Sequence, residues 1–101
     1  IRVEKKMNLE DLRKQIDELD KELVVLLAKR QKYVEKVAVV KNDKSLVVDK
    51  KRMEEVIARV KKLASEEGLS EQIAESLWRK IIELSIDHEF KELDSMQNKI
   101  K

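Results

Sequence analysis

Two cationic side chains share one face of a long apolar stripe. Apolar residues recur at alternating steps of three and four from Leu9 to Lys41, a pattern typical of a long packed helix. Arg30 interrupts this stripe, where a charge is costly unless an anion meets it. Lys41 follows eleven residues later, about 20° from Arg30 around a helix. Because arginine binds carboxylates in a bidentate manner, this face is a candidate site for a small polyanion. We call the stripe the apolar seam; its members besides Arg30 are Leu9, Leu12, Ile16, Leu19, Leu23, Leu26, Tyr33, Val37 and Val40.

Arg13 is a third cation of the same segment. It precedes Arg30 by seventeen residues, which is about 100° of rotation and ~25 Å along a helix axis. Arg13 therefore cannot join Arg30 and Lys41 within one chain, but it could do so across a dimer of antiparallel long helices. Alternatively, the cations pair with nearby carboxylates, as exposed charges ordinarily do. Candidates for such pairing are Asp17, Asp20, Glu35 and Asp49.

Ser85 and Glu89 are polar residues on an otherwise apolar helix face. On a helix they lie within about 60° of apolar neighbours. These neighbours are Ala74, Trp78, Ile81 and Ile82. Ser85 and Glu89 are therefore candidate site residues, and a half-exposed helix edge is the alternative interpretation. His88 lies one position beside this face, and we interpret it as a packing or surface residue and not as a ligand.

The periodicity predicts an all-α fold with helices at about 9–41, 49–66 and 70–98. Asp49 and Ser70 are of the residue types that cap helix N-termini, and Gly68 suits a left-handed cap after the second helix. Residues 42–48 break the pattern and are expected to form a loop. Residues 1–8 lack periodicity and are expected to form a flexible tail, which leaves 9–101 as a single domain.

The length of the first helix predicts a homodimer. A helix over residues 9–41 spans roughly 50 Å. A compact domain of this size has a radius of gyration of only ~13 Å. The helix therefore extends past its own monomer, and we expect a second copy of the chain to cover its seam.

Composition excludes several function classes. Lys and Arg number 23 against 21 Asp and Glu, and this balance disfavours a nucleic-acid binder. The sequence contains no Cys and one His, which excludes disulfides, thiolate metal sites and His-rich metal clusters. No apolar run approaches the ~18 residues needed to cross a bilayer, and no signal peptide is evident. We expect a cytoplasmic protein with no membrane contact.

The order and spacing of several short segments resemble those of the all-helical class of chorismate mutases. These segments are LRKQIDELD in the long helix, then LLAKR and a lysine eleven residues on, then DKKR, GLS and IIELSIDHE. The resemblance extends from Leu9 to about Met96. It implies an intertwined helical homodimer that rearranges chorismate to prephenate in Phe and Tyr biosynthesis, without a cofactor or a metal.

The resemblance also implies roles for individual residues. Arg13 would cross the dimer interface to hold one substrate carboxylate, and Arg30 would hold the other. Lys41 and Glu89 would face the ether oxygen of the breaking C–O bond from opposite sides. The substrate-binding residues would be Asp49, Arg52 and Ser85, with Asp49 near the ring hydroxyl. Because the reaction is unimolecular and pericyclic, a fixed substrate conformer and donors at the ether oxygen suffice.

Two positions depart from the family pattern. Many relatives carry Gln where this sequence has Glu89, and a carboxylate there would repel the charge that develops on the ether oxygen. We therefore predict a raised pKa for Glu89, or activity confined to acidic pH. Met53 follows Arg52 where the family commonly has Glu. This change predicts weaker substrate affinity, a shifted register of the second helix, or a different substrate.

Two other functions fit the same sequence features. Isochorismate-pyruvate lyases share the fold and much of the cationic pocket, and their substrate carries its hydroxyl elsewhere on the ring. A silent helical dimer that serves as an interaction or regulatory module would have the same composition and periodicity. An enzyme is favoured by the coincidence of family-type residues at Arg13, Arg30, Lys41, Ser85 and Glu89.

Overall fold

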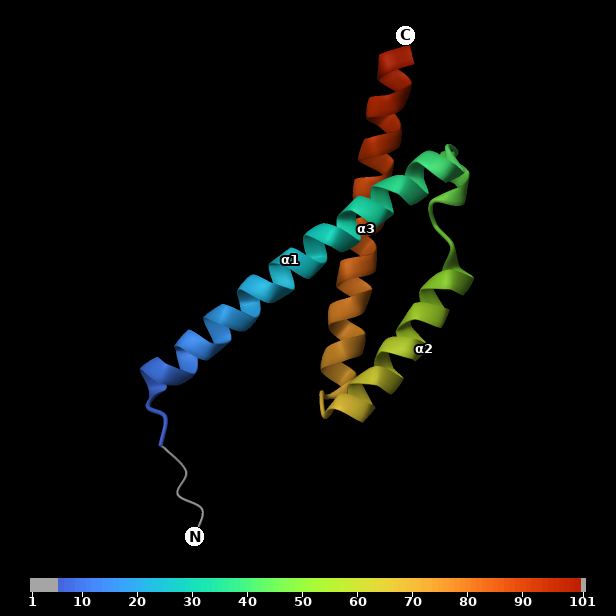
Figure 1. Ribbon diagram of the computed structural model, residues 1–101. Helices are drawn as coiled ribbons and strands as arrows, with labels where there is room; N and C mark the ends of the chain where they lie inside the picture. Colours follow the sequence, from blue (N-terminus) through green and yellow to red (C-terminus); the bar gives the residue numbers. More distant parts are fainter. Residues whose placement is uncertain (1–5, 101) are drawn as a thin grey trace. The chain divides into compact units, whose positions relative to one another are not determined.

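The computed structural model describes residues 6–100, with side chains up to residue 97. It contains helices α1 (Leu9–Lys41), α2 (Lys50–Glu67) and α3 (Glu71–Ile100), and a short 3-10 helix η1 (Lys44–Leu46) between α1 and α2 (Figure 1). No strand occurs within residues 6–100. The predicted all-α fold is confirmed, and the helix bounds agree with the predicted ones to within two residues. The expected tail lies largely outside the described residues.

Side-chain caps fix the starts of α1 and α2. Asn8 Oδ1 accepts a hydrogen bond from the Asp11 N–H at 2.8 Å, and the Asn8 N–H donates to Asp11 Oδ2 at 3.3 Å. Such a reciprocal pair satisfies donors that the first helical turn leaves open. Asp49 Oδ1 accepts from the Arg52 N–H at 3.0 Å, which confirms the predicted cap of α2.

The link between α2 and α3 is short and reverses the chain. Gly68 ends α2 with φ 75°, a left-handed conformation that glycine adopts without steric cost. The Leu69 N–H then donates to the Ala64 carbonyl at 2.8 Å. Ser70 Oγ accepts from the Ile73 N–H at 3.3 Å and begins α3. The predicted roles of Gly68 and Ser70 are confirmed, and α2 and α3 form a helical hairpin (Figure 1).

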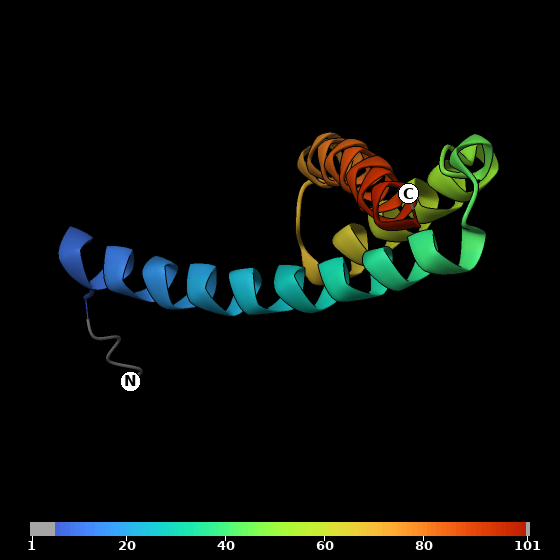
Figure 2. The same cartoon turned by 90° about the horizontal axis from the view of Figure 1, so that it is seen from above.

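The chain divides into two compact units, Ile1–Lys32 and Tyr33–Lys101, and each is described by itself. α1 contributes to both units and is one unbroken helix from Leu9 to Lys41 (Figure 2). In the first unit the apolar seam is exposed. Its exposed fractions range from 46% at Leu12 to 61% at Leu9. The seam members of this unit are Leu9, Leu12, Ile16, Leu19, Leu23 and Leu26.

The second unit has a small core where the end of α1 meets α3. Ala38 and Leu93 are fully buried and Val47 is 2% exposed. Partly buried apolar side chains pack against them, namely Ile86, Phe90 and Met96. The seam residues of this unit lie outside that core, with Val40 86% exposed. The end of α1 therefore packs into the core of the second unit through Ala38, which is not a seam residue, while the seam residues stay exposed to solvent.

α2 packs against α3 through small and branched apolar residues. Ile57 and Ala64 of α2 and Ala74 and Ile82 of α3 are all buried. Ile73 and Leu77 are also apolar residues of α3, and they are 58% and 49% exposed. The apolar stripe of α3 is wider than the surface that α2 covers.

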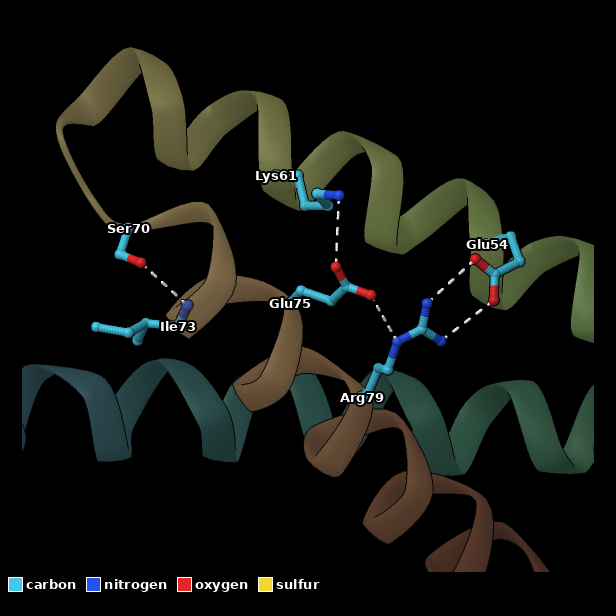
Figure 3. A network of polar contacts seen from close by, with 6 residues as sticks. All are labelled: Glu54, Lys61, Ser70, Ile73, Glu75 and Arg79. Carbon is cyan, nitrogen blue, oxygen red and sulfur yellow. Dashed lines mark hydrogen bonds and ion pairs between the residues drawn. The ribbon is translucent and has the colours of Figure 1, made fainter.

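An ion-pair network joins the exposed edges of α2 and α3 (Figure 3). The Arg79 guanidinium donates to both carboxylate oxygens of Glu54, at 3.2 and 3.3 Å, and to Glu75 at 3.0 Å. Lys61 Nζ lies 3.4 Å from Glu75 on the other side. Hydrogen bonds from Arg79 and Lys61 lower the pKa of Glu75. The bidentate Arg79–Glu54 pair thus links α2 to α3 at the exposed edge of the hairpin.

None of the helices in the described part of the chain is long and apolar enough to span a membrane.

Candidate active site

Lys41 and Glu89 face each other across the α1–α3 contact. Lys41 is the last residue of α1 and Glu89 lies in the middle of α3. Lys41 Nζ lies 4.0 Å from Glu89 Oε1, which is too far for a direct hydrogen bond. The structure therefore brings together two of the predicted catalytic residues, from segments 48 positions apart in the sequence.

Glu89 is the buried charged residue of this site. The residue is only 6% exposed, and its Oε1 has no hydrogen-bond partner among the described residues. Burial raises the pKa of Glu89, and the ammonium of Lys41 offsets part of this rise. The sequence-based prediction of a raised pKa is in this respect confirmed. The alternative interpretation, a half-exposed helix edge, was wrong for Glu89.

Lys41 is held by the loop that follows α1. Its Nζ donates to the Val47 carbonyl at 3.4 Å, and its side chain is 26% exposed. Val47 is itself buried in the core against Ala38 and Leu93. The loop thus holds the Lys41 ammonium beside Glu89, and the Lys41 side chain stays partly accessible to solvent. The sequence predicted only that residues 42–48 form a loop, and it did not predict the burial of Val47.

Ser85 lies one helical turn before Glu89 on α3. Its hydroxyl donates to the Ile81 carbonyl at 2.8 Å, and the residue is half-buried. A hydroxyl bonded to the carbonyl four residues earlier keeps its oxygen lone pairs as acceptors. Ser85 is therefore on the same face as Glu89, as the spacing predicted.

Asp49 and Arg52 lie at the start of α2, two and five residues after Val47. The Asp49 carboxylate caps the helix through Oδ1, and Arg52 supplies the N–H that it accepts. Both residues are exposed. Met53, in the position where the family commonly has Glu, is half-buried. The effect of Met53 on the substrate stays a prediction.

Arg13 and Arg30 belong to the first unit. Arg13 is exposed and Arg30 is half-buried, and both lie on α1 as predicted. The convergence of Arg13 and Arg30 with Lys41 in one site stays a prediction.

A second polar contact crosses between α1 and α3 near the site. His88 Nε2 lies 2.8 Å from Glu35 Oε1 and 3.8 Å from Glu92 Oε1. Sequence reasoning assigned His88 to packing or surface and did not find these contacts. The four-residue spacing of His88 and Glu92 was visible in the sequence, but the approach of Glu35 depends on how α1 crosses α3.

The structure defines an all-helical protein in which the cation Lys41 lies beside the buried acid Glu89. Residues 12–90 match the family described as chorismate mutase type II. The chain belongs to this family, and chorismate mutases are isomerases.

Two relatives show the extent of the similarity. The chain is 31% identical over 94 residues to the chorismate mutase of Methanocaldococcus jannaschii, a match that covers 92% of this chain and 95% of that protein. It is 34% identical over 97 residues to the T-protein of Haemophilus influenzae, which covers 91% of this chain. The matched region is 26% of the length of the T-protein.

Proposed function

We propose that this protein rearranges chorismate to prephenate, a step of aromatic amino acid biosynthesis, with Lys41 and Glu89 as the groups at the breaking bond. The observation that carries the proposal is the 4.0 Å separation of Lys41 Nζ and Glu89 Oε1. An oxygen atom at ~2.8 Å from both atoms would see them at an angle of about 90°. The Lys41 side chain is 26% exposed, so the proposed oxygen would approach from its side of the pair. The unpartnered Oε1 of Glu89 would then have a partner.

The reaction explains why a cation and an acid suffice. In a Claisen rearrangement the C–O ether bond breaks while a C–C bond forms, and no proton, electron or leaving group is transferred to the protein. Negative charge grows on the ether oxygen in the transition state, so donors placed there stabilise the transition state more than the substrate. The Lys41 ammonium is one donor, and a protonated Glu89 is the other.

Arg13 and Arg30 are proposed to hold the two carboxylates of the substrate. Guanidinium groups bind carboxylates through paired N–H donors and so fix orientation as well as position. Fixing both carboxylates selects the chair-like conformer, which supplies the proximity part of catalysis. Arg30 would act from within the subunit and Arg13 from across a homodimer interface.

The exposed apolar seam supports the homodimer. Its six members in the first unit are all at least 46% exposed. A contiguous apolar face of this kind ordinarily marks an interaction surface. A second copy of the chain presents the same seam, so two antiparallel α1 helices would cover each other.

Asp49, Arg52 and Ser85 are proposed to complete the substrate site. Asp49 is proposed to contact the ring hydroxyl through the carboxylate oxygen that does not cap α2. Arg52 would add positive charge at the same edge, and Ser85 would place its hydroxyl group at the site from α3.

The test is the identification of products from chorismate and, in a separate reaction, from isochorismate. Prephenate from chorismate is the expected result. Pyruvate and salicylate from isochorismate, with no prephenate, would instead identify a lyase. No product from either substrate would identify a silent helical module.

Matched variants connect the product to the site. We expect Lys41→Met to lower kcat by about 10²–10³-fold, the usual cost of removing a transition-state donor. Arg30→Ala is expected to abolish measurable turnover while the oligomeric state is retained. Lys44→Met is the control, because Lys44 lies three residues from Lys41 and pairs instead with the exposed Asp94. Equal losses in Lys41→Met and Lys44→Met would show that the effect is not specific to the site.

A further inference from the structure

Glu35, His88 and Glu92 form a cluster of metal-ligand type between α1 and α3. Their ligand atoms all lie within 4.8 Å of one another. The distances from His88 Nε2 are 2.8 Å to Glu35 Oε1 and 3.8 Å to Glu92 Oε1. The three side chains are between 30% and 39% exposed, so solvent ions reach them without an opening of the fold.

The spacing of these atoms fits the coordination shell of a small divalent ion. Zn²⁺ binds imidazole nitrogen and carboxylate oxygen at ~2.0–2.2 Å in a tetrahedral arrangement. Ligand atoms of such a shell are roughly 3.4 Å apart. The distances of 2.8 and 3.8 Å lie on either side of this value. Small rotations of half-exposed side chains would therefore bring the three atoms onto one ion.

The types of ligand select a class of metal. An imidazole nitrogen disfavours Ca²⁺ and Mg²⁺, which prefer all-oxygen shells, and favours Zn²⁺ and neighbouring first-row metals. Two carboxylates and a neutral imidazole also balance the charge of a divalent ion.

We propose that Glu35, His88 and Glu92 bind one Zn²⁺-class ion per chain and that this ion ties α1 to α3. His88 and Glu92 are four residues apart on α3 and therefore share one helix face. Glu35 comes from α1, six residues before Lys41. The ion would thus join the two helices that carry Lys41 and Glu89. The site is structural, it supplies no step of the rearrangement, and it does not rest on the proposed function.

The test uses the full chain without a histidine tag, first treated with a chelator and then titrated with ZnCl₂. His88 is the only histidine of the sequence, so its imidazole NMR signals report on the site without ambiguity. We expect these signals to shift with one equivalent of Zn²⁺ per chain and the Tm to rise. Co²⁺ in place of Zn²⁺ is expected to give the visible absorption of a site with nitrogen and oxygen ligands.

Single variants test each ligand. Removing an outer-shell partner of a metal ligand typically costs about 10–100-fold in affinity. We expect at least that loss, measured by calorimetry, in Glu35→Gln, His88→Gln and Glu92→Gln. Glu83→Gln is the control, because Glu83 is an exposed carboxylate of α3 that pairs with Lys80 and lies outside the cluster. Circular dichroism verifies that each variant is folded, and Glu35→Ala replaces Glu35→Gln should the latter unfold.

Two results would overturn the site. The first is an unchanged His88 spectrum at a tenfold excess of Zn²⁺ over the chain. The second is binding that His88→Gln removes but both Glu35 variants retain, because the ion would then sit on α3 alone and could not tie it to α1.

Discussion

The ammonium of Lys41 lies 4.0 Å from the buried Oε1 of Glu89, close enough for charge attraction and too far for a direct hydrogen bond. The pair is therefore incomplete by itself, and an unsatisfied buried carboxylate oxygen costs roughly 1–3 kcal/mol of stability. A buried polar atom without a hydrogen-bond partner in a native structure calls for an explanation, such as a role in binding or catalysis. A substrate oxygen that meets both atoms is the use that we propose.

The pH dependence of turnover tests the protonation state of Glu89. Burial raises its pKa, and only the protonated acid can donate to the ether oxygen. We expect kcat/KM of the wild type to fall about tenfold for each pH unit above that pKa. Glu89→Gln donates through its amide at every pH, so its profile should be flat over the same range. The measurement is kcat/KM for chorismate between pH 4 and pH 9 for both proteins.

The profiles are to be recorded in the presence of a chelator, so that no ion occupies the neighbouring cluster of His88. A wild-type rate that does not decline toward alkaline pH would show that Glu89 does not act as a protonated donor.

The same buried acid makes stability depend on pH. The pKa of Glu89 is raised in the native state, so the native protein holds this proton at pH values where the unfolded chain has lost it. The free energy of unfolding therefore decreases as pH rises through the native-state pKa. Glu89→Gln removes this contribution. We expect the Tm difference, variant minus wild type, to be more positive at pH 8 than at pH 4.

For a domain of this size each kcal/mol corresponds to a Tm change of about 4–8 °C. The comparison requires equal protein concentrations, because association also shifts Tm. A Tm difference that is constant from pH 4 to pH 8 would contradict a raised pKa.

Hybrid dimers test whether Arg13 acts across the interface. Arg13→Ala and Arg30→Ala dimers are each expected to be nearly inactive. A hybrid dimer contains one Arg13→Ala chain and one Arg30→Ala chain. If Arg13 acts in the site of the other subunit, one of its two sites carries both substitutions and the other site carries neither. Random exchange of equal amounts should then restore about a quarter of wild-type activity.

The control mixes Arg13→Ala with an Arg13→Ala, Arg30→Ala double variant, which contains no intact site in any combination. Absence of recovery in the first mixture, with exchange verified by mass spectrometry, would place Arg13 and Arg30 in the same subunit's site.

Two substitutions of Asp49 separate its capping role from substrate binding. Asn caps helices as well as Asp does, whereas loss of the cap to Ala costs about 0.5–2 kcal/mol. We expect Asp49→Ala to lower both stability and kcat/KM, and Asp49→Asn to lower kcat/KM alone. Chemical denaturation and steady-state kinetics measure the two effects. An unchanged kcat/KM in Asp49→Asn would leave Asp49 with a capping role only.

Local features of the fold were predictable because their causes are local. Asp49, Gly68 and Ser70 act within one turn of the helix ends that they cap, so their residue types and positions were sufficient. The number and the bounds of the helices followed from the local periodicity of apolar residues in the same way. The capping pair of Asn8 and Asp11 was also visible in the sequence but was not found, because residues 1–8 were treated as a tail.

Features that depend on packing between helices were not predictable to the same degree. The burial of Ala38 and Val47 follows from how the end of α1 and the next loop meet α3. The contact of His88 with Glu35 has the same origin, since the two residues are 53 positions apart. The face of Glu89 was predicted from spacing, but its near-complete burial depends on tertiary packing, which spacing on one helix does not reveal. The roles of all the candidate residues in substrate binding and catalysis stay predictions, namely those of Arg13, Arg30, Lys41, Asp49, Arg52, Ser85 and Glu89.

The uncovered seam of α1 has a consequence for how the activity would respond to the amount of protein. Leu12, Ile16 and Leu19 are exposed in the single chain, and we propose that association covers them and supplies Arg13 to each site. Association obeys mass action, so catalysis per chain should fall on dilution below the dissociation constant. The Tm should fall with it. At protein concentrations far below that constant the chains would thus be both less stable and inactive, and the activity per chain would rise steadily with the amount of protein in a cell.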